Sequence, residues 1–362
     1  MQYNVIGLMS GSSLDGLDIA FVHFEESAGK WQFDILETAC ISYSPEWRKD
    51  LASSGGLTAK DYLLLHRSYG HYLGNCINDF LEERNLSYKV QLISSHGHTA
   101  FHLPAQRMTA QLGDGASIAA VTGIRTITDL RSVDVALGGQ GAPIVPIGEK
   151  LLFPEFDFFL NIGGIANLSA KGETFIGFDV CPANRVLNLL SSGLEKGFDE
   201  NGAHAAAGRM NENLFNKLNS LSYYQLHYPK SLSNEFGLND IFPIIKNANL
   251  STQDSLRTYV EHIVFQISKS LIQLKNEISV KDDLRLLVTG GGAHNHFLTQ
   301  RLREEISSVG IELVIPGHKL IDFKEALVMA LMGALRWRED INVIHTVTGA
   351  SKDSINGAVW SV

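Results

Sequence analysis

The chain has 362 residues, 44% of them hydrophobic and 19% charged, which is enough apolar material for about two domains and is unlike a disordered protein. Its formal net charge of −9 argues against a nucleic-acid-binding protein, which needs a basic face to neutralise phosphates. Three widely spaced cysteines predict neither a disulfide framework nor a thiolate zinc site. No apolar run reaches about 18 residues and the start of the chain has no basic region, so we expect no membrane span, no signal peptide and a cytoplasmic protein.

The first half of the chain predicts a mixed α/β domain that opens with a hairpin. Residues 3–9 and 18–24 are apolar strands separated by a polar turn, and a third strand follows at 31–39. The sequence at 58–61 is typical of a helix N-terminus, and the apolar period continues to about residue 84. Further along we expect a strand at 90–95, a helix at 115–122 and a strand at 125–129.

The second half repeats this opening, which predicts two duplicated α/β domains. The glycine- and proline-rich stretch 138–146 cannot be helical, so we place the domain junction or a hinge there. The predicted lobes are 1–137 and 138–362, and the C-terminal segment is free to pack back on the first lobe. The expected elements are strands at 156–162, from 168, at 174–178 and at 284–289, and helices at 183–196, at 251–276, from about 295 and at 323–338.

Three glycine-rich segments are candidate ligand-binding turns. The hairpin turn at 11–16 offers backbone N–H groups and serine hydroxyls that could cradle a phosphate, and Asp15 could hold Mg²⁺ through a water molecule. A second turn lies at 161–167, and the triple glycine at 290–292 joins a buried strand to a helix, where a flat ring could lie on the backbone. Taken alone, each is better explained as an ordinary turn.

Taken together, the three segments resemble the two phosphate hairpins and the adenosine loop of the actin, hexokinase and Hsp70 ATPase superfamily. This resemblance implies a ribonuclease-H-like (actin-like ATPase) fold for both lobes, a cleft between them, and ATP with Mg²⁺ as cofactors. The implied cofactor-binding residues are Gly11, Ser12, Ser13, Leu14, Asp15, Gly16, Leu17, Asp18, Gly163, Gly164, Asn167, Gly290, Gly291 and Gly292.

Longer stretches extend the resemblance to one family. They are IGLMSGSSLDGLD at 6–18, SHGHT at 95–99, ALGGQGAPIVP at 136–146, NIGGIANL at 161–168 and VTGAS at 347–351. In this order they resemble the anhydro-N-acetylmuramic acid kinases over nearly the whole chain. The resemblance implies an enzyme that uses ATP and water to open 1,6-anhydro-N-acetylmuramic acid and phosphorylates O6, giving N-acetylmuramic acid 6-phosphate and ADP. It further implies a cytoplasmic homodimer in peptidoglycan recycling and amino sugar catabolism.

The resemblance also assigns roles to single residues. Asp179 stands between a predicted strand and a predicted helix, where a carboxylate is often an N-cap, but the resemblance implies the catalytic base that takes a proton from water. Arg131 is implied to bind the lactyl carboxylate of the sugar through its guanidinium, against the alternative of a surface arginine. Thr99 and Glu325 are implied to contact the sugar.

The chain departs from the family pattern at several positions. Ser12 stands where the family usually has Thr, and His98 where it has Gln. The family segment Asp-Thr-Gly-Pro-Gly-Asn reads DVCPAN here, so Cys181 and Ala183 replace glycines, and Asn188 stands at a later Asp position. Because Cys and Ala restrict the backbone more than Gly does, this segment motivates an alternative, a catalytically impaired nucleotide- or sugar-sensing relative.

Other readings of the polar residues are weaker. A glycosidase with Asp15 and Asp179 as a carboxylate pair would leave the glycine turns without a purpose. The pair His96 and His98 has no apparent third zinc ligand at a useful spacing in the sequence. The thiol of Cys181 has no evident histidine partner, so we expect it to pack in the core.

Overall fold

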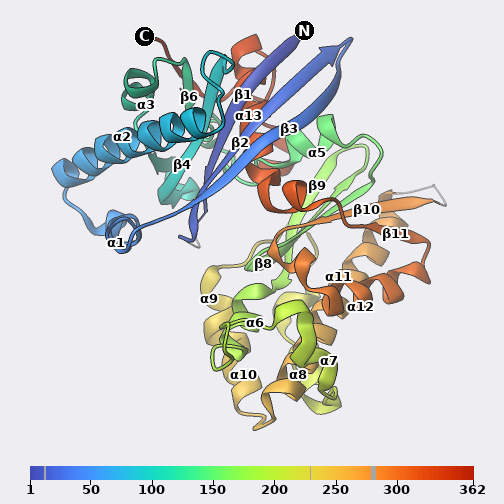
Figure 1. The fold of residues 1–362 in the computed structure, drawn as a ribbon. Helices are drawn as coiled ribbons and strands as arrows, with labels where there is room; N and C mark the ends of the chain where they lie inside the picture. Colours follow the sequence, from blue (N-terminus) through green and yellow to red (C-terminus); the bar gives the residue numbers. More distant parts are fainter. Residues whose placement is uncertain (12–13, 229, 279–282) are drawn as a thin grey trace. The chain divides into compact units, whose positions relative to one another are not determined.

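The computed structural model of the chain describes residues 1–11, 14–228, 230–278 and 283–362 (Figure 1). These residues form two compact units. The first comprises Met1–Pro154 and Phe323–Val362, and the second comprises Glu155–Asp322. The boundary predicted after residue 137, together with the glycine- and proline-rich stretch that suggested it, lies inside the first unit.

The first unit contains a seven-stranded sheet in the order β12-β6-β4-β1-β2-β3, with β5 paired to β4. Strands β1, β2 and β3 are antiparallel neighbours, whereas β4 runs parallel to β1 and β6 runs parallel to β4. The strands are β1 (Gln2–Ser10), β2 (Gly16–Ser27), β3 (Lys30–Ser42), β4 (Leu92–Leu103), β5 (Met108–Leu112), β6 (Thr126–Thr128) and β12 (Ala358–Trp360). The predicted opening strands are confirmed, but the sequence pattern missed β5 and β12.

Helix α2 (Ala59–Glu83) covers one face of this sheet. It begins as the sequence predicts, because the Thr58 Oγ1 accepts a hydrogen bond from the Asp61 N–H at 3.2 Å. Its Tyr69 is fully buried in one hydrophobic cluster with Ile6 and Leu8 of β1. The other helices and helical turns that lie wholly in this unit are α1 (Pro45–Ser53), η1 (Ser54–Gly56), η2 (Pro104–Gln106), α3 (Gly115–Thr122), α4 (Ser132–Ala136), α5 (Pro146–Leu152) and α14 (His345–Thr348).

Helix α13 (His318–Arg338) begins in the second unit and continues in the first. Its backbone departs from helical geometry at Phe323 (φ −115°), the residue at which the helix was predicted to start. In the first unit α13 lies directly against β1, because a Cβ on Gly7 would lie 1.9 Å from the Ala326 carbonyl oxygen. Successive residues of a strand point to opposite faces, so Gly7 places α13 on the face opposite to α2.

The second unit repeats the topology of the first. Its five-stranded sheet has the order β11-β10-β7-β8-β9, in which β7, β8 and β9 are antiparallel while β10 and β11 are parallel. This matches β6-β4-β1-β2-β3 strand for strand, which confirms the prediction of two duplicated ribonuclease-H-like α/β domains. The strands are β7 (Phe158–Ile162), β8 (Ile165–Lys171), β9 (Phe175–Pro182), β10 (Leu284–Thr289) and β11 (Ile311–Val314).

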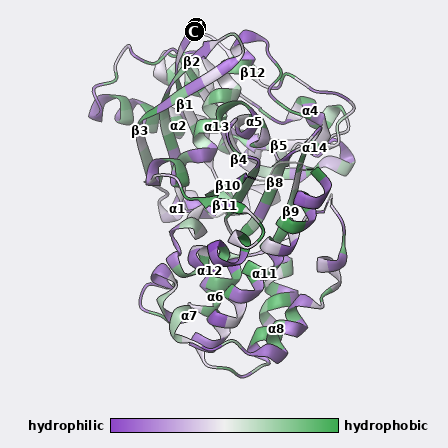
Figure 2. Ribbon diagram, turned by 90° about the vertical axis from the view of Figure 1, so that its right-hand side faces the viewer, coloured by the Kyte–Doolittle hydropathy of each residue, from purple (hydrophilic) through white to green (hydrophobic). Residues whose placement is uncertain are grey.

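The core of the second unit is formed by these strands and helix α11 (Thr252–Ile278). Figure 2 shows hydrophobic residues, coloured green, along these elements. The predicted helix at 183–196 is shorter than expected, because α6 already ends at Leu190. The helices and helical turns are α6 (Asn184–Leu190), η3 (Glu200–Gly202), α7 (Ala203–Ala207), α8 (Glu212–Asn219), η4 (Ser222–Gln225), α9 (Asn234–Phe236), η5 (Gly237–Ile241), α10 (Phe242–Lys246), η6 (Gly291–His294) and α12 (His296–Ser307). In the described parts of both units, we find no helix with the length and apolar character needed to span a membrane.

Candidate functional site

The second unit brings the second glycine turn and the triple glycine together. A Cβ on Gly290 would lie 2.4 Å from the Asn161 Oδ1, and one on Gly292 would lie 2.2 Å from the Ile162 Cγ2. Gly290 also has a positive φ of 81°, which favours glycine. Two of the three glycines are therefore required for packing against the end of β7, whereas a Cβ on Gly291 would meet nothing closer than 3.6 Å.

The turn between β7 and β8 leaves backbone groups accessible. The carbonyl groups of Gly163 and Gly164 accept hydrogen bonds from the Asn184 and Ala183 N–H groups, at 3.0 and 2.8 Å. Gly164 is exposed, and a Cβ on it would lie no closer than 3.8 Å to another atom, in the side chain of Arg185. Its own N–H donates to no residue in the described part of the chain. A turn with a free donor and open space above it can accept an anion.

Asp179 lies inside β9, next to this turn in the sheet. It pairs with Asn167 of β8, whose side-chain amide donates a hydrogen bond to the Asp179 Oδ1. The Oδ2 accepts a hydrogen bond from the Leu232 N–H at 2.8 Å. The N-cap alternative is therefore wrong for Asp179, because its carboxylate caps no helix. Both oxygens of the carboxylate are held in place, which is what a positioned base requires.

Burial raises the pKa of the Asp179 carboxyl above its usual value, although the bonds from Leu232 and Asn167 work in the opposite direction. Tyr223 supports the same strand, because its hydroxyl donates to the Asp179 carbonyl at 2.6 Å. A carboxylate with a raised pKa is a stronger base than an ordinary aspartate. The environment of Asp179 thus favours proton acceptance more than that of an ordinary surface aspartate does.

No sequence pattern indicates the contribution that the loop before α9 makes to the site. Leu232 supplies a hydrogen bond to the Asp179 side chain, and the Lys230 carbonyl accepts one from the Asp179 N–H at 3.1 Å. The Lys230 ammonium lies over the Tyr223 ring, 4.8 Å from its centroid, and burial lowers the pKa of this lysine. These residues lie far from Asp179 in the sequence and belong to no motif, so only the fold brings them to the site.

The residues that depart from the family pattern occupy positions in the second unit that do not require a left-handed backbone. Cys181 and Ala183 are fully buried, and neither has a positive φ. Burial raises the pKa of the Cys181 thiol, so it stays protonated, which confirms that this cysteine packs in the core. Asn188 is exposed. Neither replacement therefore stands at a position where a positive φ would require glycine.

Arg131 is held rigidly in the first unit. Its Nε donates to the His96 Nε2 at 2.8 Å, and its Nη1 donates to the Gly141 carbonyl at 2.7 Å. Burial lowers the pKa of Arg131 to about 10, while the charges of Glu325 and Asp134 favour the cation. The alternative of a surface arginine is wrong, because this guanidinium is partly buried and oriented by two hydrogen bonds.

His96 is a neutral partner of this arginine. Burial, followed by the charge of Arg131, lowers the pKa of His96 to about 3. Its Nε2 accepts from Arg131, so the proton is on Nδ1, which donates to the Gly97 carbonyl at 2.9 Å. The Nδ1 of His98 bonds instead to the Ser10 hydroxyl at 3.0 Å. Each of the two histidines therefore has its own hydrogen-bond partners.

Two of the family-like stretches meet at the buried Asp134, a residue that no sequence motif indicates. Its carboxylate accepts hydrogen bonds from the Gly141 N–H and the Thr348 hydroxyl, both at 2.7 Å. A Cβ on Gly139 would lie 2.3 Å from the same carboxylate. Asp134 thereby fixes Gly141, whose carbonyl in turn orients Arg131.

The remaining predicted sugar contacts also lie in the first unit. Thr99 is on β4 opposite Gln111 of β5, whose amide lies 3.5 Å from the Thr99 hydroxyl. Glu325 lies on α13, where burial raises its pKa and the charges of Lys324 and Arg131 partly offset that rise. A cavity of about 330 Å³ opens beside this region, and its lining includes Ser95, His96, Gln111, Asp129 and Ser132. Its volume falls in the usual range for small-molecule sites.

The first glycine turn is described only in part. Ser12 and Ser13 lie outside the described residues. Asp15 is exposed, and none of the described residues pairs with its carboxylate. Gly16 has a structural reason to be glycine, since a Cβ there would lie 2.7 Å from the Ile41 carbonyl oxygen of β3. The other members of this set are Gly11 and Leu14, both partly exposed, Leu17, fully buried, and Asp18, paired with Cys40 in the sheet.

Comparison with known proteins places these features in context. The profile of the family described as anhydro-N-acetylmuramic acid kinase matches residues 3–362. Proteins named anhydro-N-acetylmuramic acid kinase from Aliivibrio fischeri and Shewanella denitrificans are 35% and 33% identical to the chain, covering 98% of both sequences in each case. The one from Coxiella burnetii is 33% identical over 98% of this chain and 96% of its own length.

Structural similarity to solved proteins is lower. The activator of the 2-hydroxyisocaproyl-CoA dehydratase from Clostridium difficile with bound ADPNP aligns with a TM-score of 0.42 at 15% identity, covering 94% of this chain and 96% of that chain. The ethanolamine utilization protein EutJ from Carboxydothermus hydrogenoformans aligns with a TM-score of 0.39 at 13% identity, covering 90% of each chain.

Proposed function

Since the chain belongs to the anhydro-N-acetylmuramic acid kinase family, we propose that it opens 1,6-anhydro-N-acetylmuramic acid with water while transferring the γ-phosphoryl group of ATP to O6. The products are N-acetylmuramic acid 6-phosphate and ADP. The observation that carries this proposal is the grouping of Asp179, the open turn at Gly164 and the triple glycine in one compact unit that has a family match along its whole length.

Asp179 acts as the general base in this proposal. The bridging ether of the anhydro sugar has no hydroxyl to deprotonate, so the nucleophile is a water molecule attacking C1. Asp179 accepts the proton of that water as the C1–O6 bond breaks and O6 bonds to the γ-phosphorus. Hydrogen bonds from Asn167 and Leu232 fix the direction of the carboxylate. Asp179 thus accepts the proton of the attacking water and also orients that water toward C1.

The nucleotide occupies the glycine-rich turns in this proposal. The open space above Gly164 and its unused N–H support a phosphate there, and the exposed Gly291 supports an adenosine ring on the triple glycine. Asp15 fits Mg²⁺, because an exposed carboxylate with no partner among the described residues is the hard oxygen donor that this ion prefers. Bound Mg²⁺ supplies neutralisation of phosphate charge.

The sugar acid is recognised by Arg131 in this proposal. Its Nε and one Nη1 hydrogen are used by His96 and Gly141, which leaves the Nη2 group and the second Nη1 hydrogen for the lactyl carboxylate. Because the guanidinium is already oriented, little side-chain entropy is lost on binding. Thr99 and Glu325 complete the proposed contacts.

Location and assembly follow the family. We infer a cytoplasmic homodimer that serves peptidoglycan recycling and amino sugar catabolism. The impaired, ligand-sensing alternative draws no support from the segment that motivated it, since Cys181 and Ala183 fit their positions without a positive φ.

An isotope experiment tests the proposed chemistry. The enzyme is given ATP, Mg²⁺ and the anhydro sugar in ¹⁸O-labelled water, and the products are read promptly by mass spectrometry. We expect label at C1 of the sugar, none in its 6-phosphate, and equal amounts of ADP and sugar phosphate. Label in the phosphate, or release of free phosphate in place of sugar phosphate, would show that the protein only hydrolyses ATP and would overturn the proposal.

A further inference from the structure

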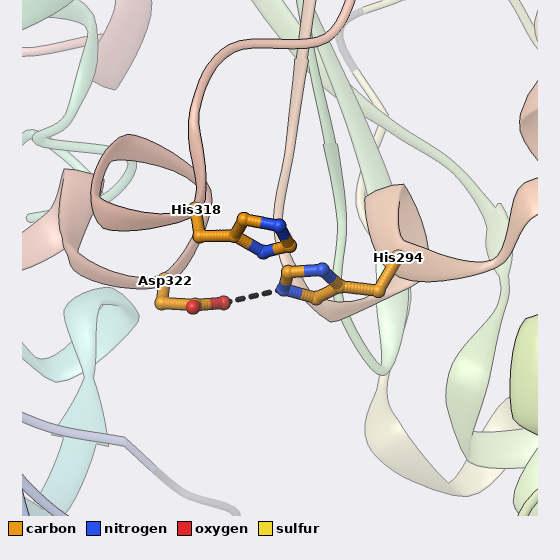
Figure 3. Close-up of side chains that lie close together, drawn as sticks. All are labelled: His294, His318 and Asp322. Atoms are coloured by element: carbon orange, nitrogen blue, oxygen red, sulfur yellow. Dashed lines mark hydrogen bonds and ion pairs between the residues drawn. The ribbon is translucent and has the colours of Figure 1, made fainter.

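Three metal-ligating side chains lie together in the second unit, apart from the residues discussed above (Figure 3). They are His294 at the end of η6, and His318 and Asp322 on the first turn of α13. One ligand atom from each residue lies within 4.8 Å of the other two. Across the described residues of the chain, this is the one such group of three or more His, Cys, Asp or Glu side chains.

Local geometry explains why these side chains converge. His318 and Asp322 are four residues apart in a helical turn, so they share one side of α13. The Gly290 N–H donates to the Ile321 carbonyl at 3.4 Å, which holds the loop before η6 beside that turn. The imidazoles of His294 and His318 then lie nearly parallel, with centroids 5.2 Å apart and an angle of 11°. The His294 Nε2 donates a hydrogen bond to the Asp322 Oδ1 at 2.6 Å.

We propose that His294, His318 and Asp322 form a binding site for Zn²⁺. Two imidazoles and one carboxylate are a donor set that this ion binds at about 2.0–2.2 Å, whereas Mg²⁺ prefers oxygen donors alone. The cation takes the place of the proton now shared by His294 and Asp322. Because His318 is exposed, its ring is free to turn toward the ion. Solvent fills the fourth position, since Asp322 is exposed too and His294 is only partly buried.

The bound ion would join two segments that are already linked by the Gly290–Ile321 and His294–Asp322 hydrogen bonds. His294 stands two positions after the triple glycine, and His318 and Asp322 lie at the start of α13. A metal bridge between them restrains the loop at 290–292 in the absence of any nucleotide. Zn²⁺ binding at this site is separate from the proposed kinase activity and does not depend on it.

Zinc titration of the untagged full-length chain tests this site. The protein is stripped with a chelator, and Zn²⁺ is added in competition with a chromophoric chelator while bound metal per chain is measured. We expect one tight equivalent in the wild type, and affinity at least tenfold weaker in His318→Ala and Asp322→Ala. Zn²⁺ should also raise the unfolding temperature of the wild type but of neither variant. Binding of Co²⁺ should give visible absorption bands that disappear in His318→Ala.

His296→Ala is the matched control, because His296 is an exposed histidine only two residues from His294 but outside the group. It should bind Zn²⁺ like the wild type. Without metal, all variants should unfold at the wild-type temperature, since the substituted side chains in His318→Ala and Asp322→Ala are exposed. The proposal is overturned if the wild type binds no more Zn²⁺ than His318→Ala, or if His296→Ala loses as much affinity as the two site variants.

Discussion

The two units share a strand order but use the glycines of their opening hairpins differently. In the second unit, the β7–β8 turn consists of Gly163 and Gly164, and a Cβ on Gly164 would meet nothing within 3.8 Å. In the first unit, a longer turn joins β1 to β2, and a Cβ on Gly16 would lie 2.7 Å from the Ile41 carbonyl. One glycine leaves open space and the other permits strand packing, although the sequence presents both as parts of similar turns. The space around each glycine therefore separates a candidate ligand contact from a packing requirement.

The largest effect is expected at Asp179, next to the open turn. In Asp179→Asn the new side chain is nearly isosteric and still accepts from the Leu232 N–H, but it cannot take a proton from water. We expect kcat to fall by about 10²–10⁴-fold, with affinity for an ATP analogue unchanged. Steady-state kinetics and calorimetric titration measure the two quantities. Activity within tenfold of the wild type would remove Asp179 from the role of base.

The two hairpins can be compared directly by adding one methyl group to each. Gly16→Ala should lower the free energy of unfolding by about 1–3 kcal/mol, because the new Cβ meets backbone that cannot move aside easily. Gly164→Ala should change it by less than about 0.5 kcal/mol, yet weaken ATP binding by crowding the phosphate. Denaturant unfolding and nucleotide titration separate the two outcomes. Equal destabilisation by both substitutions would show that the hairpins do not differ as described.

The two units also contain aspartates with opposite pKa shifts. Burial raises the pKa of Asp114 in the first unit, but bonds from Ser117 and the charge of Arg67 bring it below the usual value overall. Its contribution to stability is thus present at neutral pH and lost as pH falls, so Asp114→Asn should cost about 1–3 kcal/mol at pH 7 and progressively less in acid.

The contribution of Asp179 to stability should change with pH in the opposite direction to that of Asp114. Its pKa is raised in the folded state, so ionisation at neutral pH opposes folding, and stability falls as pH rises through the folded pKa. Asp179→Asn should therefore unfold at a higher denaturant concentration than the wild type at pH 7, with the difference vanishing in acid. Unfolding midpoints between pH 4 and 8 measure both aspartates; the same sign for both substitutions would contradict the comparison.

The smallest effect is expected at the segment that departs from the family. Ala183 has a negative φ of −124°, so no left-handed backbone demands glycine there, and we expect Ala183→Gly mainly to add freedom to the unfolded chain. We expect a loss of about 0.4–1 kcal/mol in unfolding free energy and kcat within about twofold of the wild type. A large rise in kcat would show that this alanine impairs the enzyme and would revive the ligand-sensing alternative.

Local signals in the sequence predicted much of the fold. Helix starts at Thr58 and Ser251 were visible because their side chains cap the following N–H groups, at 3.2 and 3.1 Å. Strand β12 was missed because it pairs with β6, more than 200 residues earlier, and such pairing leaves no local pattern. The sequence predicted that α13 begins at Phe323, whereas the helix begins at His318. The backbone is non-helical at Phe323, so the first turn of α13 is separated there from the rest of the helix.

Some residues of the candidate site could likewise be predicted from sequence patterns, and others could not. Glycine motifs and the strand before Asp179 could be found by pattern, as could Arg131 through its resemblance. The partners that fix these groups could not, because Leu232 and Asp134 act through contacts that only the folded chain creates. His318 and His294 likewise stand 24 positions apart and meet only because the loop before η6 lies beside the first turn of α13.

The second unit is inserted within the chain of the first, and this has a consequence for synthesis on the ribosome. The first unit needs residues 323–362, because α13 covers β1 at Gly7 and β12 completes the sheet beside β6. The second unit is continuous in sequence, so its chain emerges whole before those residues are made. A nascent first unit must therefore wait with one face of β1 uncovered while 155–322 is translated, and apolar surface left uncovered during synthesis is prone to aggregation.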